Sequence, residues 1–343
     1  MTMQPKSRES DTAQEQFASR RLVLAGVAYA VLLFVFWLLA RFFRLQQLEE
    51  RPLSTFFSFA LLIAPLWFFG FGAAVPLRHI LRKRASQIAA AALLVLPYFV
   101  LAIPGRMFHW PIALALIAIA VLSIAALQQS SKAGNGWDLV VLATGGLIID
   151  LGLLSSGALW GLHGSGIWPA GLGGFPKLIM MDIILYGYLV VKPVEGIGYD
   201  LSPTLADFKI GLREALFYAP IVIPLGLLLG FLHFHHAMPR PLMVPAAWVF
   251  TFVFVALPEE LFFRGLVQNL LERHLGRWPA LVAASVLFGL SHFNKRAVFN
   301  WRYVLLATIA GVFYGRAWRE YRRLFASSIT HSTVDTLWSL WFR

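Results

Sequence analysis

The stretch ALPEELFFRG, residues 256–265, places charged groups inside an apolar part of the sequence. Glu259, Glu260 and Arg264 interrupt it, and the residues on both sides are mostly apolar. An ionised side chain near the centre of a bilayer costs about 3 kcal/mol or more, so charges in such a place usually mark function. A lone buried carboxylate suits a general base or acid, which takes a proton from water and later returns it.

The spacing of these charges assigns them different tasks. If residues 242–271 form one helix, Glu260 and Arg264 lie on the same face and form an ion pair. Glu259 is rotated by about 100° from Glu260, so we expect it to point toward a different partner. Pro258 lacks a backbone N–H, which predicts a kink just before Glu259. We interpret Glu260 and Arg264 as a structural pair and Glu259 as the functional group.

Two later motifs carry further polar groups at helical spacing. The motif FGLSH contains Phe288 and His292, and HSTVD contains His331 and Asp335, each pair four residues apart. The three motifs fall on three of the last apolar segments, 242–271, 279–293 and 324–342, so we expect Glu259, His292 and His331 to meet inside the membrane. Peptide hydrolysis needs a base for water, a proton for the leaving amine and a donor for the oxyanion. Phe288 is interpreted as a packing residue.

The order of these motifs, EELFFR then FGLSH then HSTVD, resembles the CPBP family of CAAX-protease and bacteriocin-processing intramembrane proteases. The resemblance covers residues 205–343. It implies an all-helical membrane core with a water-accessible cavity, and hydrolysis of a peptide bond in a membrane-associated protein or peptide. By the same resemblance Glu259 activates water with help from His292, Arg264 holds Glu260, and His331 and Asp335 stabilise the oxyanion or orient the other groups.

One position departs from the prenyl-protease branch of that family, where Asn often stands at the last motif position. An ionised Asp335 accepts hydrogen bonds and donates none. It would orient His331 and leave that residue as the donor, or it is itself protonated. This departure favours a bacterial processing or immunity-type member over one that cleaves prenylated substrates.

A metal site is the alternative use of the same residues. Two histidines and a glutamate form the ligand set of some catalytic zinc sites, which here would be Glu259, His292 and His331. The motif HExxH is absent, and one glutamate does not easily serve as both ligand and base. We favour chemistry without a cofactor, with zinc as the alternative.

Composition sets the class of protein. Of 343 residues, 59% are hydrophobic and only 13% are charged, which suits a chain whose solvent is lipid. The net charge of +12 comes from short basic clusters between apolar runs, a pattern of membrane orientation and of attraction to the lipid bilayer rather than of nucleic-acid binding. Cysteine is absent, which excludes disulfides and thiolate chemistry.

Apolar runs predict an all-α integral membrane protein, a polytopic bundle of about ten transmembrane helices with a CPBP-type core in its C-terminal half. Spans need about 20 apolar residues. The run 178–191 is short and carries Asp182, so it reads as a span or as a re-entrant or interfacial segment. The candidates are 22–40, 54–77, 86–103, 111–127, 138–160, 178–191, 214–233, 242–271, 279–293, 303–318 and 324–342.

Three regions follow from this pattern. Residues 1–21 form a polar, disordered cytoplasmic tail, residues 22–192 an N-terminal transmembrane region, and residues 193–343 the protease-like core. We interpret 22–40 as a retained span and not as a signal peptide. The basic clusters predict a multi-pass protein of the plasma (inner) membrane with its N-terminus in the cytoplasm.

Two other functions stay open beside the protease. A non-catalytic scaffold or bacteriocin-immunity-type protein would keep the motif residues for packing, and a proton-coupled transporter would use the buried acids as a relay. The remaining polar features have plainer interpretations: Gly311 and Gly315 in GVFYG as close helix packing, the histidines of HFHH as interfacial residues, Gly164–Gly174 as a linker. We expect Asp150 and Asp182 to be satisfied by backbone hydrogen bonds.

Overall fold

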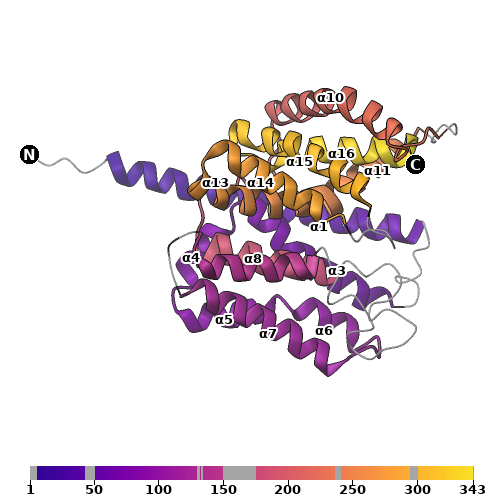
Figure 1. The fold of residues 1–343 in the computed structure, drawn as a ribbon. Coiled ribbons are helices and arrows are strands. Elements are labelled where there is room, and N and C mark those ends of the chain that lie inside the picture. The colour runs from indigo at the N-terminus through magenta and orange to yellow at the C-terminus, as the bar shows by residue number, and fades with distance from the viewer. Residues whose placement is uncertain are drawn as a thin grey trace, which may run out of the picture. The chain divides into compact units, whose positions relative to one another are not determined.

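The computed structural model describes residues 6–42, 51–129, 132, 134–149, 175–235, 241–293 and 300–342. Every regular element among them is a helix, which confirms the all-α prediction (Figure 1). The chain divides into two compact units. The first comprises Met1–Gln129 and Leu153–Pro193, and the second comprises Ser130–Gly152 and Val194–Arg343. All the motifs described above lie in the second unit.

The first unit is built around a buried helix, α9, which the π-helical segment η2 continues. Ten of the 12 residues of α9 are buried, so it is a core element and not an interfacial one. Helices α3 and α7 pack against it. The helices of this unit are α1 (Lys6–Phe42), α3 (Pro52–Gly70), α4 (Ala74–Ile80), α5 (Arg84–Leu93), α6 (Leu96–Ala102), α7 (Trp110–Leu127), α9 (Phe175–Tyr186) and η2 (Gly187–Val191).

Two predictions for this unit are wrong in detail. Residues 6–21 are helical and not disordered, because they contain no Gly or Pro and continue without interruption into the apolar part of α1. The predicted span 54–77 is broken between α3 and α4. Gly72 in the intervening turn has a φ of 94°, a conformation that ends a right-handed helix and that Gly adopts without steric cost.

The second unit places four long helices around the site. Helix α14 packs along α15, and α10 packs against both α15 and α16 (Figure 1). The elements of this unit are α8 (Gly136–Ile149), α10 (Leu205–Leu228), α11 (Met243–Thr251), η3 (Phe252–Ala256), α12 (Leu257–Glu260), η4 (Leu261–Gln268), α13 (Asn269–Leu275), α14 (Arg277–Leu290), α15 (Trp301–Tyr321) and α16 (Leu324–Trp341).

The segment Met243–Leu275 is one continuous helical rod with two π-helical stretches, η3 and η4, on either side of α12. Pro258 has no N–H to donate, and its ring would clash with the carbonyl four residues back in a regular α-helix. The wider turns of η3, directly before Pro258, relieve that clash. The expected disturbance at Pro258 is therefore a widened helix, a feature often found at functional sites.

Helix α10 starts at Leu205, nine residues before the predicted span at 214. Thr204 and Asp207 form a capping box: the Asp207 amide donates to the Thr204 hydroxyl at 3.3 Å, and the Thr204 amide donates to the Asp207 carboxylate at 2.8 Å. Such a box satisfies amides that a helix start leaves unpaired. The guanidinium of Arg323 also donates to Asp207, at 2.6 Å and 2.9 Å, which ties the start of α10 to the turn before α16.

Close packing of α14 on α15 depends on glycine, as predicted. A Cβ added at Gly311 would lie 2.9 Å from the Cα of Ser285, and one at Gly315 would lie 2.3 Å from the Cδ1 of Leu281. Small residues let two helix backbones approach. This approach brings the face of α15 that carries Tyr314 next to the residues of α14 and η4.

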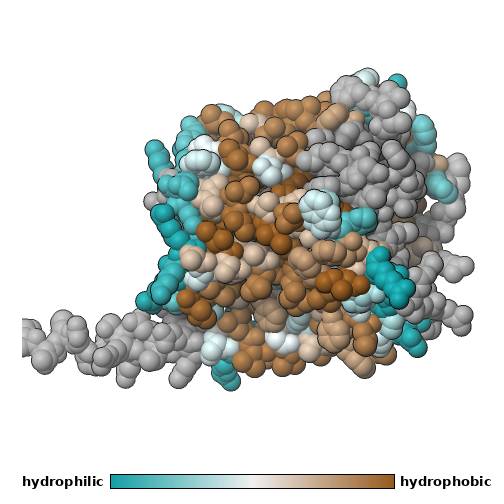
Figure 2. Space-filling view, turned by 90° about the horizontal axis from the view of Figure 1, so that it is seen from below, coloured by the Kyte–Doolittle hydropathy of each residue, from teal (hydrophilic) through white to brown (hydrophobic). Residues whose placement is uncertain are grey.

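Six helices of the described residues are long and apolar enough to cross a membrane, which supports a multi-pass membrane protein. They are Ser19–Leu38, Pro52–Gly70, Arg84–Ala102, Trp110–Leu127, Leu205–Leu228 and Met243–Leu275. Figure 2 shows hydrophobic side chains over much of the face in view, as lipid contact requires. Helices α15 and α16 have the length but carry more polar residues. The total of about ten spans stays a prediction.

Candidate active site

The imidazole of His331, on α16, is the point on which the carboxylates of the motifs converge. Its Nδ1 lies 2.8 Å from Oε1 of Glu260, and its Nε2 lies 3.4 Å from Oδ2 of Asp335 and 3.9 Å from Oε2 of Glu259. Asp335 is one helical turn further along α16 and remains 31% exposed. The other two carboxylates are almost completely buried. Three acids from two helices therefore surround one ring.

This arrangement corrects one expectation. Glu259 contacts His331 and Glu260 pairs with Arg264, as expected, but Glu260 also approaches His331, at the opposite ring nitrogen. A rotation of about 100° between neighbouring residues is enough to place one carboxylate at each edge of a ring that stands against the helix. Glu260 thus pairs with Arg264 and also contacts His331, so its contacts extend beyond the structural pair that the spacing suggested.

Arg264 supplies the positive charge beneath the site. Its Nε lies 3.1 Å from Oε2 of Glu260, which confirms the predicted ion pair, and both side chains are buried. The guanidinium carbon also lies 4.5 Å from the ring centre of Phe288 and 5.3 Å from that of Tyr314. Aromatic faces attract a desolvated cation. Phe288 is therefore more than a packing residue, because it holds the cation in place.

His292 lies beyond the end of its helix and contacts Phe288, which in turn contacts His331. Helix α14 ends at Leu290, so His292 lies in the following turn, although the sequence predicted it inside the span 279–293. Its Nδ1 is 2.9 Å from the Phe288 carbonyl oxygen and 3.1 Å from the Ser291 hydroxyl. Its ring centre is 4.9 Å from that of Phe288, which in turn is 5.7 Å from that of His331.

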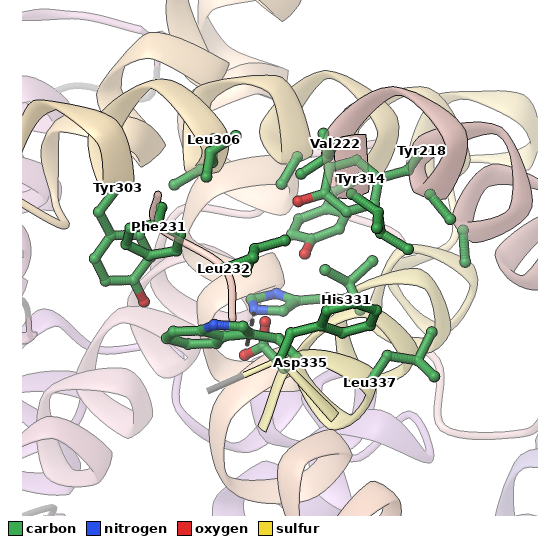
Figure 3. A pocket seen from close by; sticks show the side chains of 18 of the residues that line it. Tyr218, Val222, Phe231, Leu232, Tyr303, Leu306, Tyr314, His331, Asp335 and Leu337 are labelled. Carbon is green, nitrogen blue, oxygen red and sulfur yellow. Dashed lines mark ion pairs between the residues drawn. The ribbon is translucent and has the colours of Figure 1, made fainter. Parts of the chain in front are cut away.

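A cavity lies over His331 and Asp335, and His292 opens into it as well (Figure 3). Its walls come from α10, the turn after α10, α14, α15 and α16, and they are mainly apolar and aromatic. Apart from His331, Asp335 and His292, few polar side chains lie on the walls. The lining includes Tyr218, Val222, Phe231, Leu232, Tyr303, Leu306, Tyr314 and Trp338. Such a cavity admits an apolar ligand and offers it a small set of polar groups.

Comparison with known proteins agrees with this geometry. Residues 241–337 match the family model described as type II CAAX prenyl endopeptidase, Rce1-like. This region is similar to an Rce1-like domain. The resemblance to the CPBP family is thereby confirmed for the C-terminal part of the chain. No curated protein and no solved structure matches the chain.

The zinc alternative depends on the ring nitrogens of His331. Catalytic zinc takes ring nitrogens that carry a free lone pair, whereas both nitrogens of His331 face carboxylate oxygens. Across the described ranges, no group of three or more His, Asp or Glu side chains is arranged to hold a metal ion. Chemistry without a cofactor stays a prediction, with zinc held by Glu259, His292 and His331 as its alternative.

The other polar features of the sequence have separate outcomes. The Nδ1 of His233 lies 2.9 Å from the Leu232 carbonyl, and the His235 amide donates to the Trp341 carbonyl at 2.8 Å. His236, Asp150 and the loop 164–174 fall outside the described residues. The expectation for Asp182 is wrong, since neither carboxylate oxygen has a hydrogen-bond partner among the described residues.

Two residues of the site did not emerge from the sequence. Tyr314 stacks on His331, with ring centres 4.5 Å apart and planes at 15°. Tyr218 enters the same cavity from α10. Tyr314 was within reach of sequence reasoning, because it lies inside the motif GVFYG and one turn from Gly311. Tyr218 had no such signal, since α10 carries none of the motifs.

Proposed function

We propose that the second unit hydrolyses a peptide bond of a membrane-associated protein or peptide. The observation that carries the proposal is the convergence of Glu259, Glu260 and Asp335 on His331, which together with Asp335 lines an apolar cavity. The match to a family of endopeptidases supports it. An apolar cavity inside a membrane bundle suits a substrate that arrives through lipid.

In this proposal Glu259 is the base. It takes a proton from water while the water oxygen attacks the carbonyl carbon, and the carbonyl electron pair moves onto its oxygen. The tetrahedral intermediate then collapses, the C–N bond breaks, and the amine leaves with the proton that Glu259 held. His292 opens into the cavity beside Phe288 and helps to orient the water. One water is consumed and no other reactant is needed.

The other charged groups prepare this step. Arg264 balances Glu260 and so lets a second acid, Glu259, lie next to it in a buried place. Asp335 and Glu260 hold the ring of His331 from its two ends, which fixes the ring plane. A preorganised set of charges costs no reorganisation when the reaction occurs. We place this chemistry in the plasma (inner) membrane, with the N-terminus in the cytoplasm.

Substitution of Glu259 tests the proposal. The full chain is reconstituted in liposomes with two quenched fluorescent peptides, one with a farnesylated CAAX ending and one an unprenylated apolar peptide. Glu259→Gln should lower kcat by about 10²–10⁴-fold, the usual contribution of a general base, without changing the unfolding temperature. Glu195→Gln, in an exposed loop of the same unit, is the matched control and should cleave like the wild type.

The same experiment separates the alternatives. A scaffold or immunity-type protein predicts no cleavage of either peptide by the wild type and a biological effect that survives Glu259→Gln. A transporter predicts flux that depends on a pH gradient. Cleavage of the unprenylated peptide alone would support the substrate preference suggested by Asp335.

A further inference from the structure

We infer that the hydroxyl groups of Tyr218 and Tyr314 donate hydrogen bonds to the oxygen that becomes negative when water attacks the scissile carbonyl. The inference rests on the proposed hydrolysis and adds to it the groups that stabilise the intermediate. It concerns α10 and α15, two elements that carry none of the proposed base, ion-pair and imidazole groups.

The need for such donors follows from the residues already in the site. An oxyanion is stabilised by hydrogen-bond donors aimed at it. Asp335, as a carboxylate, accepts hydrogen bonds only. His331 directs Nδ1 at Glu260, 2.8 Å away, and Nε2 at Asp335, 3.4 Å away. Both of its nitrogens are therefore engaged with acids, and the floor of the cavity offers acceptors where the reaction needs a donor.

The two tyrosines supply the missing hydrogen-bond donors. Tyr218 and Tyr314 both line the cavity above His331 and Asp335 in the view of Figure 3. Neither hydroxyl makes a hydrogen bond to another of the described residues. Both phenols lie within electrostatic range of the Asp335 carboxylate and of each other. A phenol O–H is a good donor, and these two are uncommitted and open to the cavity.

Their rings are held in place, as a donor for a short-lived intermediate requires. Tyr314 stacks on His331 and lies under Arg264, whose guanidinium carbon is 5.3 Å from its ring centre. Tyr218 packs edge-on against Phe313, with ring centres 5.7 Å apart and planes at 73°. Donors that are positioned before the reaction stabilise the developing charge without paying for reorientation.

The other donors on the cavity wall, Trp338 and Tyr303, have different ring contacts from Tyr314. Trp338 and Tyr303 contact each other at 5.5 Å between ring centres, and both contact Phe231. The rings of Phe288 and Tyr314 are those that contact His331. Trp338 and Tyr303 belong to an aromatic patch that reaches His292, whose ring centre is 4.8 Å from that of Tyr303, whereas Tyr314 stacks on His331.

Substitution by phenylalanine tests the inference, because it removes the hydroxyl and keeps the ring. With the liposome assay and the two peptides above, Tyr218→Phe and Tyr314→Phe should each lower kcat by about 10²-fold, the scale reported for loss of one oxyanion donor. KM should stay constant, since the lost interaction is made only in the transition state. The double variant should lose more than either single variant.

Tyr186→Phe is the matched control. It removes a buried hydroxyl in the first unit, one that donates to the Gln87 carbonyl at 3.0 Å, and should leave kcat unchanged. Should Tyr314→Phe fail to fold, Tyr218→Phe decides alone, because the ring of Tyr218 takes no part in the stack on His331.

The outcomes separate the two proposals. Wild-type cleavage that Glu259→Gln abolishes, with kcat unchanged in both tyrosine variants, would leave the hydrolysis standing and overturn the inference. A raised KM with unchanged kcat would also overturn it, because the tyrosines would then only bind the substrate. Absence of cleavage by the wild type would remove both proposals together.

Discussion

Each unit has a buried acid among apolar helices, but the two acids differ in their polar partners. In the first, the Asp182 carboxylate on α9 is 1% exposed and has no hydrogen-bond partner among the described residues. In the second, Glu260 is equally buried but contacts Arg264 and His331. One acid is isolated, and the other is part of a network.

The neighbours of each acid explain the difference. The positions three and four residues from Asp182 are Leu178, Ile179, Leu185 and Tyr186, so α9 places no cation one turn from its acid. Glu260 has Arg264 one turn away, and a second helix adds an imidazole. A buried charge is tolerated when it is paired and hydrogen-bonded, and a lone acid is costly.

The variant with the largest expected effect on stability is Arg264→Met. Removal of one partner leaves Glu260 as an uncompensated buried charge, which should lower the free energy of unfolding by about 3–5 kcal/mol. Thermal unfolding in detergent measures the loss. The double variant Arg264→Met/Glu260→Met should recover most of it. If the single variant is as stable as the wild type, the pair does not hold the network together.

A second test asks whether the network depends on close helix packing. Gly311→Ala places a Cβ 2.9 Å from the Cα of Ser285, so the backbones of α14 and α15 must move apart. We expect a loss of about 1–3 kcal/mol in stability. Gly26→Ala is the control, because a Cβ there meets nothing within 4 Å. Equal unfolding temperatures for the two variants would argue against tight packing at α15.

The third test concerns the tie between α10 and the turn before α16. Asp207→Ala removes the capping box and both hydrogen bonds to Arg323. A lost cap costs about 1 kcal/mol, and a partly exposed ion pair adds up to about 1 kcal/mol. We expect about 2 kcal/mol in total. Hydrogen exchange should rise at the first turn of α10 and not in α14. Uniform exchange would contradict this local role.

The smallest effect is expected in the first unit. Asp182→Leu replaces an isolated acid by an apolar side chain, and unfolding should become harder by about 1 kcal/mol, the lower end of the range for an unpaired buried polar group. Asp182→Asn, which keeps a polar group, should change less. A large loss of stability with Asp182→Leu would show that this acid has a partner after all, and the contrast between the units would fail.

The sequence predicted the ion pair between motif residues better than it predicted the boundaries of the helices. Residues at helical spacing, such as Glu260 and Arg264, interact through local geometry that any helix imposes, so their ion pair was predictable. The start of α10 at Leu205 was not found from hydropathy, because a polar capping box extends the helix beyond its apolar part. The π-helical stretch η3 was likewise not predicted, because a proline such as Pro258 by itself predicts only a kink.

Chemistry-bearing residue types and their order were thus determined by the sequence alone, as were an all-helical fold and a membrane location. Only the tertiary structure decided that Glu259 and Glu260 share one imidazole, that His292 lies beyond the end of α14, and that Tyr218 enters the same cavity. The physical reason is that side-chain spacing fixes contacts within one helix. Contacts between helices depend on how closely α10, α14, α15 and α16 pack, which no single segment encodes.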